Sequence, residues 1–121
     1  MTTILRHALN KHFDGWRFDT LLAPGGARDN FRGRFRSPPL AYKVWAKSGT
    51  MRYIKGLAGY LDSASGRRLI FAIFTHDAAK RAYLENDPER FSSKSKRASA
   101  RWRNDVEHLE EGLIQRWITT H

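Results

Sequence analysis

Residues 42–74, which read YKVWAKSGTMRYIKGLAGYLDSASGRRLIFAIF, decide the fold of this chain. Apolar and polar side chains alternate over Tyr42–Lys47, Tyr53–Leu61 has a second strand pattern, and Leu69–Phe74 is a continuous apolar run. Residues 62–66, Asp-Ser-Ala-Ser-Gly, have the composition of a hairpin turn. Because both connections are short, the three strands are predicted to be antiparallel neighbours.

Two details of these strands predict their surroundings. The apolar run Leu69–Phe74 is typical of a strand that is buried on both faces. Gly56 and Gly59 weaken the second strand, so another backbone or side chain is expected to approach it closely there.

Helical patterns flank the strands. Apolar spacing predicts a helix over Thr3–Phe13, a short turn or helix over Trp16–Leu22 and a short helix over Asp77–Leu84, while residues 25–40 form a long loop. Apolar residues recur three and four apart from Ala98 to Trp117, which predicts a long amphipathic helix, Ser95–Thr119, on one face of the sheet. The fold class is therefore α/β of the α+β type: an antiparallel three-stranded sheet, about 41–75, with a packed C-terminal helix, about 95–119.

Composition limits the class of protein. The 121 residues fit one domain or a fragment of one, and there is no cysteine and no apolar run long enough for a membrane span. Residues 1–40 carry seven basic and three acidic side chains and residues 41–76 carry six and one, so +9 of the +10 net charge lies before residue 77. Such a field attracts anionic peptides or nucleic acid, and it is equally typical of a solvated basic surface.

The strand-like run Ala41–Thr50 contains the triplet Lys47-Ser48-Gly49, and the stretch from Val44 to Met51 is followed by Gly56-Leu-Ala-Gly-Tyr and Ser65-Gly-Arg-Arg-Leu-Ile-Phe-Ala. In order and spacing these segments resemble the C-terminal end of the D-alanyl-D-alanine carboxypeptidase/endopeptidase family, the class C low-molecular-mass penicillin-binding proteins. The family has Ala-Lys-Thr-Gly-Thr, Leu-Ala-Gly-Tyr and Gly-Arg-x-Leu-Ala-Phe strands there. The resemblance covers most of this chain from Thr3, but only about the last quarter of the family's length. It implies a fragment of the penicillin-binding, serine β-lactamase-like transpeptidase fold, with residues 1–121 as the C-terminal part of its catalytic domain.

The resemblance also implies roles for four residues. In the family a serine forms an acyl-enzyme with a peptidoglycan peptide ending in D-Ala-D-Ala, or with a β-lactam. Lys47 would be the catalytic cation, Ser48 would hydrogen-bond the terminal carboxylate, Gly49 would leave room for the substrate backbone, and the Thr50 N–H would form half of the oxyanion hole. Strict alternation sends Lys47 and Ser48 to opposite faces, so both reach one site only at an open strand edge.

No nucleophile is expected in this chain. The family's Ser-x-x-Lys and Ser-x-Asn motifs do not occur before Lys47, and the formal match Ser93–Lys96 follows it, in a polar run without a hydrophobic anchor. The chain alone is therefore expected to be inactive and to need the missing N-terminal part of the enzyme as its partner.

An alternative is a small basic nucleic-acid-binding module that uses a group of arginines: Arg28, Arg32, Arg34 and Arg36. If the enzyme reading holds, nucleic acid binds only non-specifically. No cofactor is expected, and no metal, because the five histidines lack ligand spacing. The resemblance implies a periplasmic protein, whereas Met1–Phe13 lacks the apolar region of a secretory signal, which would leave the chain in the cytoplasm.

Overall fold

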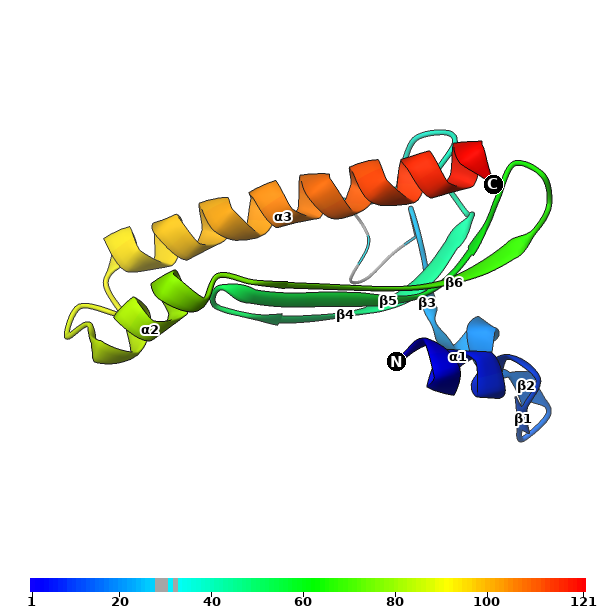
Figure 1. Cartoon of the computed structure of the whole chain (residues 1–121), viewed down its shortest axis with the longest axis horizontal. Coiled ribbons are helices and arrows are strands. Elements are labelled where there is room, and N and C mark those ends of the chain that lie inside the picture. The colour runs from blue at the N-terminus through cyan, green and yellow to red at the C-terminus, as the bar shows by residue number, and fades with distance from the viewer. Residues whose placement is uncertain (28–30, 32) are drawn as a thin grey trace.

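A four-stranded antiparallel sheet forms the centre of the computed structural model, which describes residues 1–27, 31 and 33–121. Its strands follow the order of the chain: β3 (Ala23–Pro24), β4 (Val44–Met51), β5 (Ile54–Asp62) and β6 (Arg68–His76) (Figure 1). The three predicted strands and their antiparallel order are confirmed. The fourth strand, β3, was not predicted, because two residues are too few to show an alternating pattern.

The long helix α3 (Ser93–Thr120) covers one face of this sheet (Figure 1). The Ser92 side chain caps it by accepting a hydrogen bond from the Ser95 N–H, at 3.2 Å. Ile114 and Ile118 are fully buried against the sheet. The sheet residues of this core lie at alternate positions of the strands: Val44, Ala46, Leu57, Leu61 and Phe71.

The loop 25–40 contributes to the same core. Phe31 and Phe35 are each only 1% exposed, and their rings meet edge to face with centroids 5.4 Å apart. Phe31 and Phe35 therefore belong to the buried core and are not surface residues.

On the opposite face lies the N-terminal segment, where the predicted helix is too long. α1 (Thr2–Leu9) ends four residues before Phe13, and His12–Phe13 forms β1, which pairs with β2 (Trp16–Arg17). Asp14 and Gly15 both have positive φ, 51° and 83°, as the two central residues of a tight hairpin require. The short 3-10 helix η1 (Phe18–Leu21) follows.

β6 is an edge strand of the sheet, and the prediction that it is buried on both faces is wrong, because Phe71 is its one buried residue. Phe71 faces α3 and is 4% exposed, whereas Phe74 lies on the α1 side and is 68% exposed. The apolar run is therefore covered by α3 on one face and only partly covered on the α1 side. After β6, Asp77 caps α2 (Ala78–Asn86), close to the predicted bounds.

The close approach predicted at the two glycines is confirmed. A Cβ on Gly59 would lie 2.0 Å from the Trp45 carbonyl oxygen, and one on Gly56 would lie 3.2 Å from the Phe74 ring.

Candidate functional site

The triplet Lys47-Ser48-Gly49 lies where β4 becomes an open edge. β3 pairs with β4 only at Ala23↔Ala46 and Pro24↔Trp45. From Lys47 to Met51, the described residues place no strand beside this edge. The open edge that would let neighbouring side chains reach one site is therefore present.

A hydrogen bond at the start of β4 shows which backbone N–H and C=O groups point toward this edge. The Val44 carbonyl accepts a hydrogen bond from the Gly25 N–H, at 2.7 Å, on the β3 side. Because backbone groups of an antiparallel strand repeat their direction every second residue, the N–H and C=O groups of Ser48 and Thr50 also point to that side. The Ser48 carbonyl accordingly accepts a hydrogen bond from Lys47 Nζ, at 2.7 Å.

The four predicted site residues differ in their surroundings. Lys47, Gly49 and Thr50 are exposed and Ser48 is half-buried. Within the described part of the chain Lys47 has no ion pair. A Cβ on Gly49 would meet no atom of the described residues within 4 Å, so their packing does not require glycine there.

The side of the sheet that carries α3 holds a second lysine. Lys55 is 2% exposed, and its Nζ lies 3.1 Å from Glu107 of α3 and 3.4 Å from the Thr50 hydroxyl. Lys55 is thus neutralised and structural, whereas Lys47 is available for an external anion.

An apolar groove of about 380 Å³ adjoins the triplet on the α1 side. Its walls come from the N-terminal segment and the strands: Met1, Ile4, Leu5, Phe18, Leu22, Lys47, Ser48, Gly49, Gly56, Leu57, Ala58 and Phe74. A larger hollow of about 420 Å³ lies between α2 and α3 and contains none of the four predicted residues. We assign the site to the groove, because the motif residues line it.

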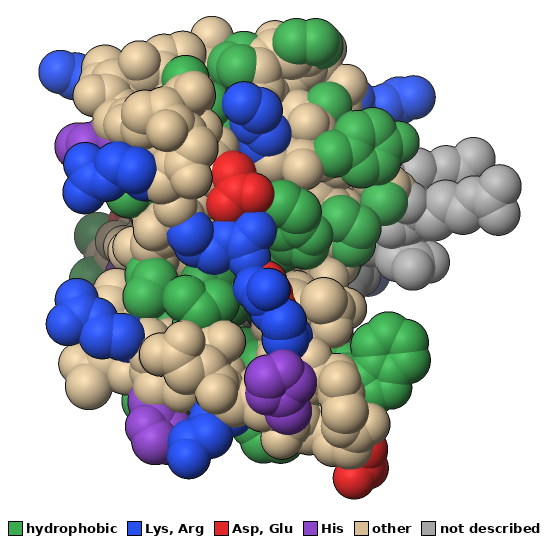
Figure 2. All heavy atoms as spheres, turned by 90° about the vertical axis from the view of Figure 1, so that its right-hand side faces the viewer, with side chains coloured by type: hydrophobic (Ala, Val, Ile, Leu, Met, Phe, Trp, Pro, Cys, Tyr) green, Lys and Arg blue, Asp and Glu red, His purple; other side chains and the backbone are tan. Residues whose placement is uncertain are grey.

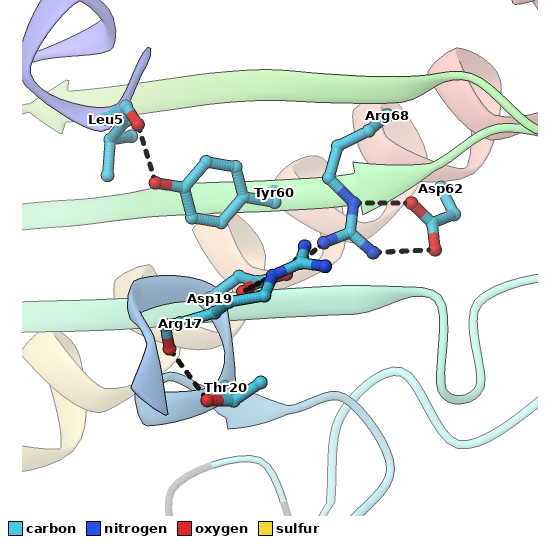
Figure 3. A network of polar contacts seen from close by, with 7 residues as sticks. All are labelled: Leu5, Arg17, Asp19, Thr20, Tyr60, Asp62 and Arg68. Carbon is cyan, nitrogen blue, oxygen red and sulfur yellow. Dashed lines mark hydrogen bonds and ion pairs between the residues drawn. The ribbon is translucent and has the colours of Figure 1, made fainter. Parts of the chain in front are cut away.

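A polar network holds the N-terminal segment against the sheet (Figure 3). Tyr60 donates its phenolic hydrogen to the Leu5 carbonyl, at 2.7 Å. Asp19 of η1 pairs with Arg17, at 2.7 Å, and with Arg68, which also binds Asp62 at 2.7 Å. The network fixes α1, and with it one wall of the groove.

Burial and neighbouring charges shift the pKa of Asp19 in opposite directions. Burial alone would raise the pKa of Asp19, but the hydrogen bond from Arg17 and the charges of Arg17 and Arg68 outweigh it and hold that pKa below its ordinary value. Burial raises the pKa of Tyr60, so its hydroxyl stays a donor. Figure 2 shows this end of the molecule from outside, where basic side chains surround a few acidic ones. Sequence reasoning missed these residues, since no local pattern marks partners 49 residues apart.

The remaining candidates do not join the site. Ser93 and Lys96 are exposed on the first turn of α3, which is not the dry environment that a nucleophile needs. Arg34 is 8% exposed and binds Glu110 and Glu111, so it is not a surface arginine, while Arg28 and Arg32 lie outside the described residues. Within the residues described, no three His, Cys, Asp or Glu side chains cluster as a metal site would require. Among them, too, no helix combines the length and apolar character needed to cross a bilayer.

Comparison with solved structures relates this arrangement to known proteins. Penicillin binding protein 4 (dacB) from Haemophilus influenzae matches with a TM-score of 0.55 and 27% identity, over 62% of this chain and 17% of that one. A second structure of that protein, complexed with a novel beta-lactam, matches with a TM-score of 0.58 and 27% identity, over 83% and 20% of the two chains. The Bd0816 predatory endopeptidase from Bdellovibrio bacteriovorus, in complex with immunity protein Bd3460, has 19% identity and a TM-score of 0.53, over 96% and 24%, which shows the fold alone.

This chain thus spans 17–24% of the length of these relatives. No curated protein sequence matches it. The model of the D-Ala-D-Ala carboxypeptidase 3 (S13) family matches residues 1–94, which is most of the chain. The sheet is accordingly part of a penicillin-binding transpeptidase fold, and the chain belongs to the S13 D-Ala-D-Ala carboxypeptidase family.

Proposed function

We propose that residues 1–121 form the C-terminal part of the catalytic domain of a serine-type D-Ala-D-Ala carboxypeptidase, with the open edge of β4 as one wall of its active site. The observation that carries this proposal is the edge itself. It leaves the Thr50 N–H without a strand partner, close in the chain to Ser48 and to Lys47, which has no ion pair within the described residues. The substrate is a peptidoglycan stem peptide that ends in D-Ala-D-Ala, and β-lactams occupy the same position.

Each of the four residues has a task that suits its place. The peptide lies along β4 as an added strand and uses the free backbone groups of the edge. The Thr50 N–H donates to the oxygen on which negative charge develops, and the Ser48 hydroxyl binds the terminal carboxylate. Lys47 holds a positive charge next to the nucleophile. Gly49, which the packing of the described residues does not require, leaves space for the substrate.

The nucleophilic serine comes from a segment outside these 121 residues. Its Ser-x-x-Lys and Ser-x-Asn motifs would dock over the groove beside Lys47, where Ile4 and Phe74 are 67% and 68% exposed. Without that segment there is no covalent route, so the chain alone is inactive. The proposed substrate places the assembled enzyme in the periplasm, and its basic surface binds nucleic acid only non-specifically.

Acylation by a fluorescent penicillin tests this proposal. We expect no labelling of the chain alone, and labelling once it is combined with the front segment of a structurally similar relative. Lys47→Ala should then reduce the acylation rate at least about 100-fold, because the cation near the reacting atoms is lost.

Lys43→Ala is the matched control, four residues upstream and outside β4, and it should leave acylation unchanged. Covalent labelling of the chain alone that disappears in Ser93→Ala would show that the dismissed serine is the nucleophile. An acylation rate that Lys47→Ala does not change would remove β4 from the active site.

A further inference from the structure

The charges of α3 are arranged against its macrodipole. Residues 89–103 contain six basic side chains and one acidic one, whereas residues 104–121 contain one basic and four acidic ones. A helix favours acidic groups near its N-terminus and basic groups near its C-terminus. Residues 89–121 together carry seven basic and five acidic side chains, so their net charge is small. The basic and acidic residues nevertheless lie in separate halves, in an order that lowers the stability of the helix.

The acidic half of α3 has partners inside the molecule. Glu107 pairs with Lys55, and Glu110 and Glu111 both pair with Arg34, at 2.9–3.1 Å. These contacts explain why acidic residues are found in the second half of the helix despite the dipole.

No ion pair among the described residues explains the basic side chains in the first half of α3. Five cations on the first three turns are exposed and form no ion pair with any described residue: Lys94, Lys96, Arg97, Arg101 and Arg103. The neighbouring helix α2 differs, because its Lys80 pairs with Asp77 and its Arg81 with Glu85. The α3 cations are therefore suited to an anion outside the molecule.

Large apolar side chains accompany these cations. Phe91, directly before α3, is 70% exposed, with the Arg90 guanidinium 5.0 Å from its ring centre, and Tyr83 of α2 is 73% exposed. In Figure 1, α2 and the start of α3 project beyond the ends of the strands. We call Arg90, Phe91 and the five cations of α3 the basic tip.

The basic tip is held rigidly by the β4–β5 turn. Arg52 donates hydrogen bonds to the Ser95 and Ser99 hydroxyls, at 2.7 and 3.2 Å, and to the Arg90 carbonyl. Tyr53, next along the turn, packs its ring against Trp102 with centroids 5.7 Å apart. The exposed groups are thus presented in a fixed arrangement.

We propose that the basic tip docks on an anionic phospholipid surface. Lys94, Arg97 and Arg101 share one face of α3 by their spacing of three and four residues. Together with the exposed ring of Phe91 they fit a flat bilayer interface, where the basic groups meet phosphates and the ring enters the headgroup layer. A nucleic-acid strand that followed the hollow beside the tip would meet Asp87 and Glu89, which repel its phosphates, whereas a flat bilayer surface does not enter the hollow. This inference does not depend on the proposed enzyme function.

Vesicle co-sedimentation of the whole chain tests the proposal. We expect binding to phosphatidylcholine vesicles that contain about a third phosphatidylglycerol, weakening as salt is raised, and little binding to pure phosphatidylcholine. Replacing Lys94, Arg97 and Arg101 by Gln should weaken binding about 100-fold. Phe91→Ala should weaken it about fivefold without changing the salt dependence.

The control is the triple variant Arg6→Gln, Lys11→Gln and Arg67→Gln, which removes three exposed cations elsewhere. It should bind nearly as well as the wild type. The basic-tip variant should melt at or above the wild-type temperature, because repulsion with the helix dipole is relieved. Equal binding to neutral vesicles, equal losses in the two triple variants, or tighter binding of a short single-stranded oligonucleotide through the same cations would each overturn the proposal.

Discussion

Glu110 is the residue whose environment is most unusual for its type. It is fully buried on α3, one carboxylate oxygen binds Arg34 at 2.9 Å, and the other has no hydrogen-bond partner among the described residues. Burial raises the pKa of Glu110, and the charges of Arg34 and Lys55 offset this only in part. The carboxyl group therefore holds a proton more readily in the folded chain than in the unfolded one.

Glu110→Gln should change how stability depends on pH. Because the folded-state pKa is raised, the contribution of Glu110 is greatest below its ordinary value of 4.5 and is lost as pH rises through the folded value. The wild type should thus lose stability relative to Glu110→Gln as pH increases. Urea unfolding of both proteins between about pH 4 and 8 measures this difference.

Asp19→Asn supplies a contrast of opposite sign in the same experiment. The pKa of Asp19 is lowered, so its contribution is present above its ordinary value of 3.8 and is lost as pH falls. A wild type whose free energy of unfolding rises with pH relative to that of Glu110→Gln would contradict the direction assigned to the Glu110 pKa.

Sequence could point to candidate site residues but not to the ion pairs that form around the site and the core. The Lys47-Ser48-Gly49 triplet is visible because its residues are contiguous. Arg34 looked like one of several surface arginines, since its partner Glu110 is 76 residues away and no periodic pattern links them.

At the scale of elements, the two glycines of β5 allow a matched test. Gly59→Ala should destabilise the fold by about 3 kcal/mol, because its Cβ would collide with the Trp45 carbonyl, which a strand cannot move without losing its pairing. Gly56→Ala meets only the Phe74 ring, which is exposed and can turn away, so it should cost less than about 1 kcal/mol. Thermal melts of the two variants compare these costs, and equal losses would show that the β4–β5 contact is not as tight as described.

Elements with long patterns were predicted well and short ones were not. The α3 pattern repeats over many turns, and its start differs from the prediction by only two residues. The β1–β2 hairpin was taken for helix and turn because His12 and Phe13 also fit helical spacing, and the φ > 0 conformation of Asp14 and Gly15 decided the outcome. β3 was missed because its two residues gain strand structure only from pairing with β4.

For the whole molecule, the open face of the sheet predicts self-association. Phe71 is covered by α3, but Ile4 and Phe74 leave apolar area exposed around the groove. Replacing both by Gln should weaken association about tenfold, as measured by sedimentation velocity over a range of concentrations. Leu109→Gln removes an apolar side chain that is 53% exposed on α3, and it should have little effect. A wild type that stays monomeric at high concentration would contradict this prediction.

The order of the strands has a consequence for how this chain is built. β3, β4, β5 and β6 lie in space as they occur in sequence, so each strand can pair with one already synthesised. A growing chain on the ribosome could assemble the sheet one strand at a time. The last helix must return over a long stretch of chain, to meet Val44 and Leu57 with Ile114 and Ile118. Until those final residues emerge, the inner face of the sheet lacks the cover of α3, and this interval is when a chaperone would be of most use.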